Sequence, residues 1–140
     1  MKVAFVQFMK GGDTAELESL KSVDGIDVMR CDRNYGFFNT LSDSDKAELT
    51  DCHNSLLERA FSGKYDAVIL DELNFAYGHK LMDCGRAERL ILDNAGKREI
   101  AITGREPAQV FVDAADYISE IKCVRHPYQK GISARRGIEY

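Results

Sequence analysis

The stretch YDAVILDELN, residues 65–74, decides the fold of this chain. It reads as a short apolar strand that ends directly in two carboxylates, Asp71 and Glu72. An unbroken apolar run of this kind is typical of an interior strand that is covered on both faces, as in a parallel α/β sheet. Open α/β sheets bind ligands at the carboxyl ends of their strands. We therefore expect the two acids to lie at a ligand-binding edge.

Strand and helix signals alternate along the rest of the chain. Four more strands are predicted where β-branched and aromatic residues gather, at Lys2–Phe8, Ile26–Cys31, Ile100–Thr103 and Tyr117–Cys123. Helical spacing of apolar residues predicts helices at Ala15–Val23, Ser42–Ser62, Cys84–Ala95 and Pro107–Ala115. The alternation predicts a three-layer α/β fold with a mostly parallel sheet, and 140 residues suit one domain, 1–140.

The longest predicted helix carries signals at both ends. Ser42 is followed three residues later by Asp45, which is the spacing of a capping box. Gly63 comes directly after the last apolar residues and is expected to end the helix.

Asp71 and Glu72 form a Walker-B-like pattern. One carboxylate at such a strand end can hold Mg²⁺, directly or through water, while the other orients a nucleophile or the metal shell. The competing interpretation is an acidic turn without a ligand, because many strands end in acidic residues.

Two other predicted strands end in groups that could bind phosphate. Thr103-Gly104-Arg105 places a hydroxyl and a guanidinium at the same sheet edge, where Arg105 could pair with a phosphate or with either acid. Lys10-Gly11-Gly12 could form an anion-binding nest. A plain turn with solvent-facing side chains is the alternative for both segments.

Composition narrows the classes of partner. The formal net charge is −4, which favours neither nucleic acid nor an anionic membrane. No apolar run approaches the roughly 20 residues that span a bilayer. The four cysteines (Cys31, Cys52, Cys84, Cys123) contain no CxxC spacing, so we expect reduced thiols in a cytoplasmic protein. The adjacent Cys52 and His53 do not have the spacing of metal ligands.

A phosphate-binding P-loop requires the pattern G-x-x-x-x-G-K-[ST]. The two Gly-Lys pairs, at 63–64 and 96–97, are followed by Tyr65 and Arg98 and lack the upstream glycine. We therefore expect no P-loop in this chain.

The tail, 125–140, shows no regular spacing of apolar residues that would predict a helix or a strand. It is either an ordered cover over the site or a loose C-terminus.

These segments together resemble the P-loop-type ATP:corrinoid adenosyltransferases, which modify cob(I)alamin or cob(I)yrinic acid a,c-diamide. VAFVQFMKGG is similar to the family's VVQFIKG, and YDAVILDELNFAYGHKLMD is similar to YDLVVLDELNYALRYGLLD. IAITGREP resembles VVLTGR, and residues 124–140 resemble the ending VKHPFDAGIKAQKGIEY. The resemblance runs through nearly all 140 residues in order.

The resemblance implies a P-loop NTPase-type fold, a homodimer, and transfer of the 5′-deoxyadenosyl group of ATP to Co(I) of a corrinoid with Mg²⁺. It implies that Asp71 and Glu72 serve the metal, and that Lys10, Thr103 and Arg105 lie on the nucleotide and phosphate side. Gly36-Phe37-Phe38-Asn39 stands where the family has GFTW, whose aromatic residues pack beside the corrin. Phe37 keeps an aromatic position, while Asn39 occupies the tryptophan position unless Phe38 substitutes for it.

The family's first strand, P-loop and first helix have no counterpart in this sequence. We expect their loss to leave two unsatisfied interior edges in the sheet. Three outcomes stay open: the flanking strands pair directly, another chain supplies the missing unit, or the sequence is a fragment.

Two functional hypotheses follow. The first is a corrinoid adenosyltransferase-like protein in cobalamin biosynthesis or salvage, whose own turnover is in doubt without a P-loop. The second is a non-catalytic corrinoid-binding, carrier or regulatory homologue, with a subunit that needs a P-loop-bearing partner as a third possibility.

Overall fold

The computed structural model describes residues 1–11, 17, 19–20, 22–36 and 38–135. Within the predicted helix 15–23, the described residues 17, 19 and 20 are helical. Gly12 and Phe37, two positions of the predicted sites, lie outside the described residues.

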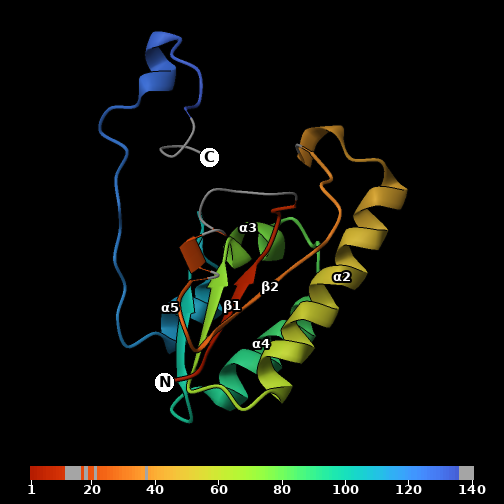
Figure 1. The fold of residues 1–140 in the computed structure, drawn as a ribbon, viewed down its shortest axis with the longest axis vertical. Helices are drawn as coiled ribbons and strands as arrows, with labels where there is room; N and C mark the ends of the chain where they lie inside the picture. The colour runs from red at the N-terminus through yellow and green to blue at the C-terminus, as the bar shows by residue number, and fades with distance from the viewer. Residues whose placement is uncertain (12–16, 18, 21, 37, 136–140) are drawn as a thin grey trace.

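The described part of the chain forms a parallel sheet of four strands (Figure 1). The strands are β1 (Val3–Gln7), β2 (Ile26–Arg30), β3 (Ala67–Asp71) and β4 (Glu99–Ile102), and their order across the sheet is β2-β1-β3-β4. Every adjacent pair is parallel. This confirms the predicted α/β class, while the expected unsatisfied interior edges do not occur between these four strands.

Helices cover the sheet and connect its strands. They are α2 (Asp43–Ser62), α3 (Leu73–Gly78), α4 (Cys84–Asn94) and α5 (Gln109–Ala114), with short 3-10 helices η1 (Phe38–Thr40) and η2 (Pro127–Lys130). The predicted capping box is present, because the Ser42 hydroxyl accepts the Asp45 backbone N–H at 3.1 Å. Gly63 is the C-cap of α2, as predicted. None of the described helices combines the length and apolar content that a bilayer crossing requires.

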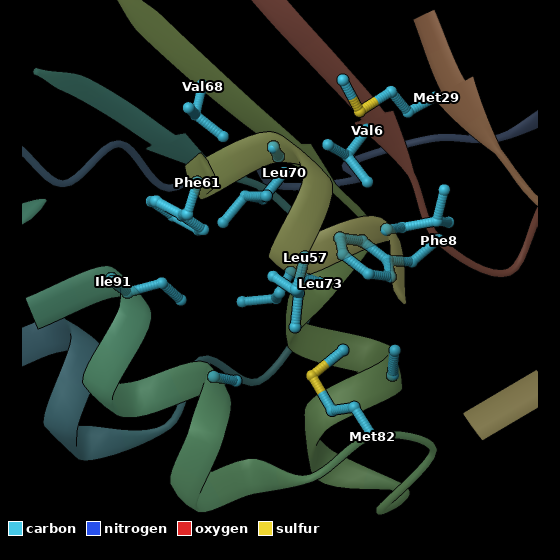
Figure 2. Packing of buried hydrophobic residues seen from close by; sticks show 14 of the residues in the cluster. Val6, Phe8, Met29, Leu57, Phe61, Val68, Leu70, Leu73, Met82 and Ile91 are labelled. Carbon is cyan, nitrogen blue, oxygen red and sulfur yellow. The ribbon is translucent and has the colours of Figure 1, made fainter. Parts of the chain in front are cut away.

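The core lies between the sheet and α2, α3 and α4 (Figure 2). Val6 of β1 pairs in register with Leu70 of β3, so alternate residues of both strands point to this one face. Leu57 of α2 and Leu73 of α3 meet them there, and all four side chains are fully buried. Helix α4 adds Ile91, which Figure 2 shows on the same side of the sheet.

The predicted strand at Tyr117–Cys123 is wrong. The segment continues from α5 without pairing, and Figure 1 shows it running clear of the sheet before η2. Tyr117 and Ile121 are 94% and 95% exposed. The segment has the β-branched and aromatic residues that are typical of strands. A strand forms only where a neighbouring strand accepts its hydrogen bonds, and no described strand lies beside this segment.

The expectation of reduced thiols is also wrong for two cysteines. Cys31, just after β2, is joined to Cys52 of α2 by a disulfide with a Cα–Cα distance of 6.1 Å. A spacing of 21 residues carries no signal for such a bond, because α2 folds back over the end of β2 only in the tertiary structure. Cys84 and Cys123 are free thiols.

Candidate functional site

Three neighbouring strands deliver polar side chains to one edge of the sheet. Asp71 ends β3, Lys10 follows β1, and Thr103 follows β4. The Thr103 hydroxyl donates to Asp71 Oδ1 at 2.8 Å, and Lys10 Nζ lies 3.1 Å from Asp71 Oδ2. We call Asp71, Thr103 and Lys10 the strand-end array. Sequence reasoning assigned all three to a ligand site, and the fold brings them into direct contact.

Glu72 turns the chain from β3 into α3. Its backbone has φ of 60°, in the left-handed region that few residues other than glycine adopt. Its N–H donates to the Thr103 hydroxyl oxygen at 3.0 Å. Thr103 therefore fixes the Asp71 carboxylate and the backbone of Glu72 to the end of β4.

The loop that carries Lys10 is held from the core by a histidine. The Met9 N–H donates to His53 Nε2 at 3.3 Å, and His53 Nδ1 lies 2.8 Å from the Leu81 carbonyl oxygen. A carbonyl only accepts, so Nδ1 carries the proton and Nε2 is the acceptor. Burial lowers the pKa of His53 to about 4, and the ring stays neutral.

Asn74, the second residue of α3, ties this helix to the end of β4. Its backbone N–H donates to the Thr103 carbonyl at 3.2 Å, and its side-chain amide donates to the Gly104 carbonyl at 3.4 Å. Its Oδ1 atom is buried and has no hydrogen-bond partner among the described residues. A buried acceptor without a donor is uncommon in proteins.

Arg105 is the predicted site residue that the fold does not bring into the array. It is exposed and forms no ion pair with Asp71 or Glu72 in the described part of the chain. This agrees with the alternative interpretation of a solvent-facing side chain, and it leaves the guanidinium available to an incoming phosphate.

The second predicted region, near residues 36–39, packs onto α3. The Phe38 ring lies edge-on to Phe75 and to His79, with centroids 5.6 and 4.4 Å apart. Phe75 and His79 are stacked at 4.0 Å with an interplanar angle of 21°. We call Phe38, Phe75 and His79 the aromatic cluster. Asn39 is exposed beside it.

Sequence reasoning found Phe38 but missed Phe75, His79 and His53. Phe75 and His79 stand four residues apart, which is the spacing of side chains that stack on one helix face. That signal was readable in LNFAYGH, 73–79, if the short helix after Glu72 had been predicted. His53 could not be recognised, since its partners are backbone groups 44 and 28 residues away.

The donor set of the array suits a hard divalent cation. Carboxylate and hydroxyl oxygens are the protein ligands that Mg²⁺ prefers, and Mg²⁺ commonly takes one or two carboxylates with the rest of its shell from water and phosphate. No group of three or more acidic, histidine or cysteine side chains that could hold a metal unaided exists in the described residues. The Asp71 carboxylate and the Thr103 hydroxyl are thus oxygen donors of the kind that suits a cation bound together with phosphate and water.

Comparison with known proteins shows the family of this chain. The family model for ATP:corrinoid adenosyltransferase BtuR/CobO/CobP matches residues 1–140. The corrinoid adenosyltransferase of Pseudomonas aeruginosa is 28% identical over 142 residues, which cover 100% of this chain and 70% of that protein. The corrinoid adenosyltransferase of Escherichia coli K12 is 24% identical, over 99% of this chain and 71% of its own length. The chain belongs to the ATP:corrinoid adenosyltransferase family.

Proposed function

We propose that this chain serves adenosyl transfer from ATP to the Co(I) form of a corrinoid, and that it supplies the corrinoid surface and the metal side of the nucleotide site. The observation that carries the proposal is the strand-end array next to the aromatic cluster. Helix α3 begins at the array, where Asn74 is bonded to the end of β4, and it carries Phe75 of the cluster. Helix α3 thus starts two residues after Asp71 of the array and carries one ring of the cluster, Phe75.

In the reaction, the electron pair of Co(I) forms the bond to C5′ of ATP while the C5′–O bond breaks and triphosphate leaves with its electrons. Asp71 and Glu72 would hold Mg²⁺, which neutralises charge on the leaving triphosphate. Thr103 keeps the Asp71 carboxylate oriented, and Lys10 and Arg105 provide cations for the phosphates.

Lys10 has two possible partners in this scheme. Without nucleotide it neutralises Asp71, with the two side chains 36% and 20% exposed. With Asp71 engaged by a metal ion, the Lys10 ammonium group would be available to a phosphate oxygen. In this proposal, the ion pair between Lys10 and Asp71 neutralises both charges until the nucleotide binds.

The 140 residues do not contain a P-loop, the segment that binds the nucleotide phosphates in this type of fold. No G-x-x-x-x-G-K-[ST] occurs among the 140 residues, so the amides and lysine of a P-loop have to come from other polypeptide. β4 is the outermost of the described strands on its side of the sheet, and its outer edge can accept the hydrogen bonds of a further strand. We propose that these 140 residues bind corrinoid by themselves and that turnover requires a P-loop supplied by further polypeptide.

A non-catalytic corrinoid carrier or regulatory protein is the second candidate. Two observations favour it: Lys10 already neutralises Asp71, and Asn39 is exposed where the family has a tryptophan. An amide cannot provide the apolar ring surface that displaces an axial ligand. The homodimer that the resemblance implies is part of the proposal in either case, and sedimentation of the purified chain measures it.

The test separates the candidates by ligand. Purified chain is titrated with cob(II)alamin, followed by electron paramagnetic resonance, and separately with Mg-ATP, followed by calorimetry. We expect corrinoid binding and weak or absent ATP binding by the chain alone, and Co–C bond formation from Co(I) corrinoid and Mg-ATP only when a P-loop-bearing polypeptide of the family is added, whereas a carrier would form no Co–C bond in either case. Tight Mg²⁺-dependent ATP binding would rule out the carrier, and lack of any response to corrinoid would overturn both candidates.

A further inference from the structure

The aromatic cluster contains one group that the proposed adenosyl transfer does not use, the imidazole of His79. This residue follows α3 as its C-cap and is exposed. Its Nδ1 atom lies 3.0 Å from the carbonyl oxygen of Phe75, one helical turn earlier. A carbonyl oxygen accepts and never donates, so the proton of the neutral ring is on Nδ1. Nε2 is left with a lone pair.

Two rings hold this imidazole in place. Phe75 stacks on it at 4.0 Å and Phe38 meets it edge-on at 4.4 Å. Together with the Nδ1 hydrogen bond, these contacts restrict both torsions of the side chain. An imidazole whose second nitrogen is bonded to a backbone carbonyl is the usual form of a histidine metal ligand in proteins.

The other two histidines, both within the described residues, lack this property. His53 is fully buried and uses both ring nitrogens, toward Leu81 and Met9. His126 is exposed, but its Nδ1 accepts the Tyr128 N–H at 3.1 Å, so in the neutral ring the proton is on Nε2. His79 alone combines an exposed ring with an unprotonated nitrogen that is not bonded to the protein.

We propose that His79 Nε2 binds the cobalt of a Co(II) corrinoid as an axial ligand. The proposal rests on corrinoid binding by this chain, as inferred above. Phe38 and Phe75 give the corrin an apolar surface beside the imidazole, and nitrogen is a donor that first-row transition metals favour. The amide of Asn39, exposed next to Phe38, leaves this side of the cluster free of a bulky ring.

The axial nitrogen would change what the bound corrinoid can do. A donor along the axis favours the Co(II) state over Co(I), because the axial ligand tunes the potential of a macrocycle-bound metal. A corrinoid held by His79 is therefore in a resting or carrier state. Release of the imidazole would have to precede reduction to Co(I).

The experiment uses cob(II)inamide, a corrinoid that has no nitrogen base of its own, with the full chain under anaerobic conditions. We expect the electron paramagnetic resonance lines of the bound Co(II) to show a triplet splitting from one ¹⁴N nucleus. Labelling the histidines with ¹⁵N should turn each triplet into a doublet. His79→Gln should abolish the splitting and weaken cob(II)inamide binding by about tenfold, the low end of the losses seen when the hydrogen-bond partner of a metal ligand is removed.

His126→Gln is the matched control, and it should keep both the splitting and the affinity. His79→Phe preserves the apolar surface and should bind the corrinoid without the nitrogen splitting. Bound cob(II)inamide without a nitrogen splitting, or a splitting that survives in His79→Gln, overturns the proposal for His79 alone. If gel filtration finds no cob(II)inamide with the folded protein, the proposed function fails with it.

Discussion

The strand-end array lies before the first residue of α3, while the aromatic cluster includes Phe75 of α3 and its C-cap His79. The two groups differ in how many of their polar atoms already have partners within the chain. In the array, both Asp71 oxygens are bonded, to Thr103 and to Lys10. In the cluster, the His79 ring is positioned by neighbours but keeps an exposed, unprotonated nitrogen.

This difference indicates which half of the site has to break existing contacts before a ligand binds. A ligand of the array has to exchange an existing ion pair for its own contacts, so part of its binding energy is spent on release of Lys10. A ligand of the cluster meets groups that are already oriented. We therefore expect corrinoid binding to be independent of the array, and the following predictions test that independence from the largest effect to the smallest.

Gly104→Ala should break the array and leave the cluster intact. Gly104 has φ of 120°, which strains any side chain, and an added Cβ would lie 3.0 Å from the Asn74 Cβ. We expect a loss of about 3 kcal/mol in the free energy of unfolding from backbone strain and this contact. Urea denaturation measures the loss, and the folded variant should retain wild-type affinity for cob(II)inamide. Equal loss of corrinoid affinity would show that the two regions are coupled.

Acid should loosen the loop that carries Lys10. The pKa of His53 is about 4 in the folded chain, below its ordinary value of 6.5, so the unfolded chain binds more protons between these values. Stability is therefore full above pH 6.5 and falls as the pH drops toward 4. The expected loss in the free energy of unfolding between pH 7.5 and pH 5 is about 2 kcal/mol.

His53→Gln removes the titrating group and serves as the matched variant. Its unfolding free energy should change little between the same two pH values, although it starts from a lower value. A wild-type chain that is equally stable at pH 7.5 and pH 5 would contradict the neutral buried imidazole.

Phe38→Ala should weaken the cluster and leave the array intact. The variant removes two ring contacts and the apolar surface proposed for the corrin. Cob(II)inamide affinity should fall by about tenfold, equivalent to about 1.4 kcal/mol. Ser42→Ala, which removes the N-cap of α2 at a cost of about 1 kcal/mol in stability, is the control and should not alter affinity.

The smallest effect is expected from Asp71→Asn combined with Glu72→Gln. The double variant removes the charge from the array while it preserves shape, so corrinoid affinity should stay within about twofold of wild type. Titration by electron paramagnetic resonance gives that number. A large loss in a folded double variant would mean that these acids contact the corrinoid and are not confined to the nucleotide side.

The sequence predicted the parts of this protein that depend on neighbours along the chain. The alternation of strands and helices, the capping box at Ser42 and the acids at the end of β3 were all readable, because each depends on spacing within a few residues. The resemblance to the adenosyltransferases rests on the same local motifs, and the family comparison confirms it.

The errors share one physical cause. Tyr117–Cys123 has strand composition but no described partner strand, and Cys31 and Cys52 are joined only because α2 returns across the end of β2. Both outcomes depend on contacts between segments that are distant in sequence. Composition and periodicity carry no information on such contacts.

By itself, then, the sequence determined the fold class, the family and the acids at a sheet edge, since local patterns encode which residues face a core and where a strand ends. Only the tertiary structure decided that Lys10 and Thr103 close on Asp71, that His53 is neutral and that the Nε2 atom of His79 is free to bind. The two histidine properties depend on which backbone carbonyl or amide lies within 3.3 Å of a ring nitrogen. Those distances, like the contacts of Asp71, are set by the pairing order of the strands and the path of the helices.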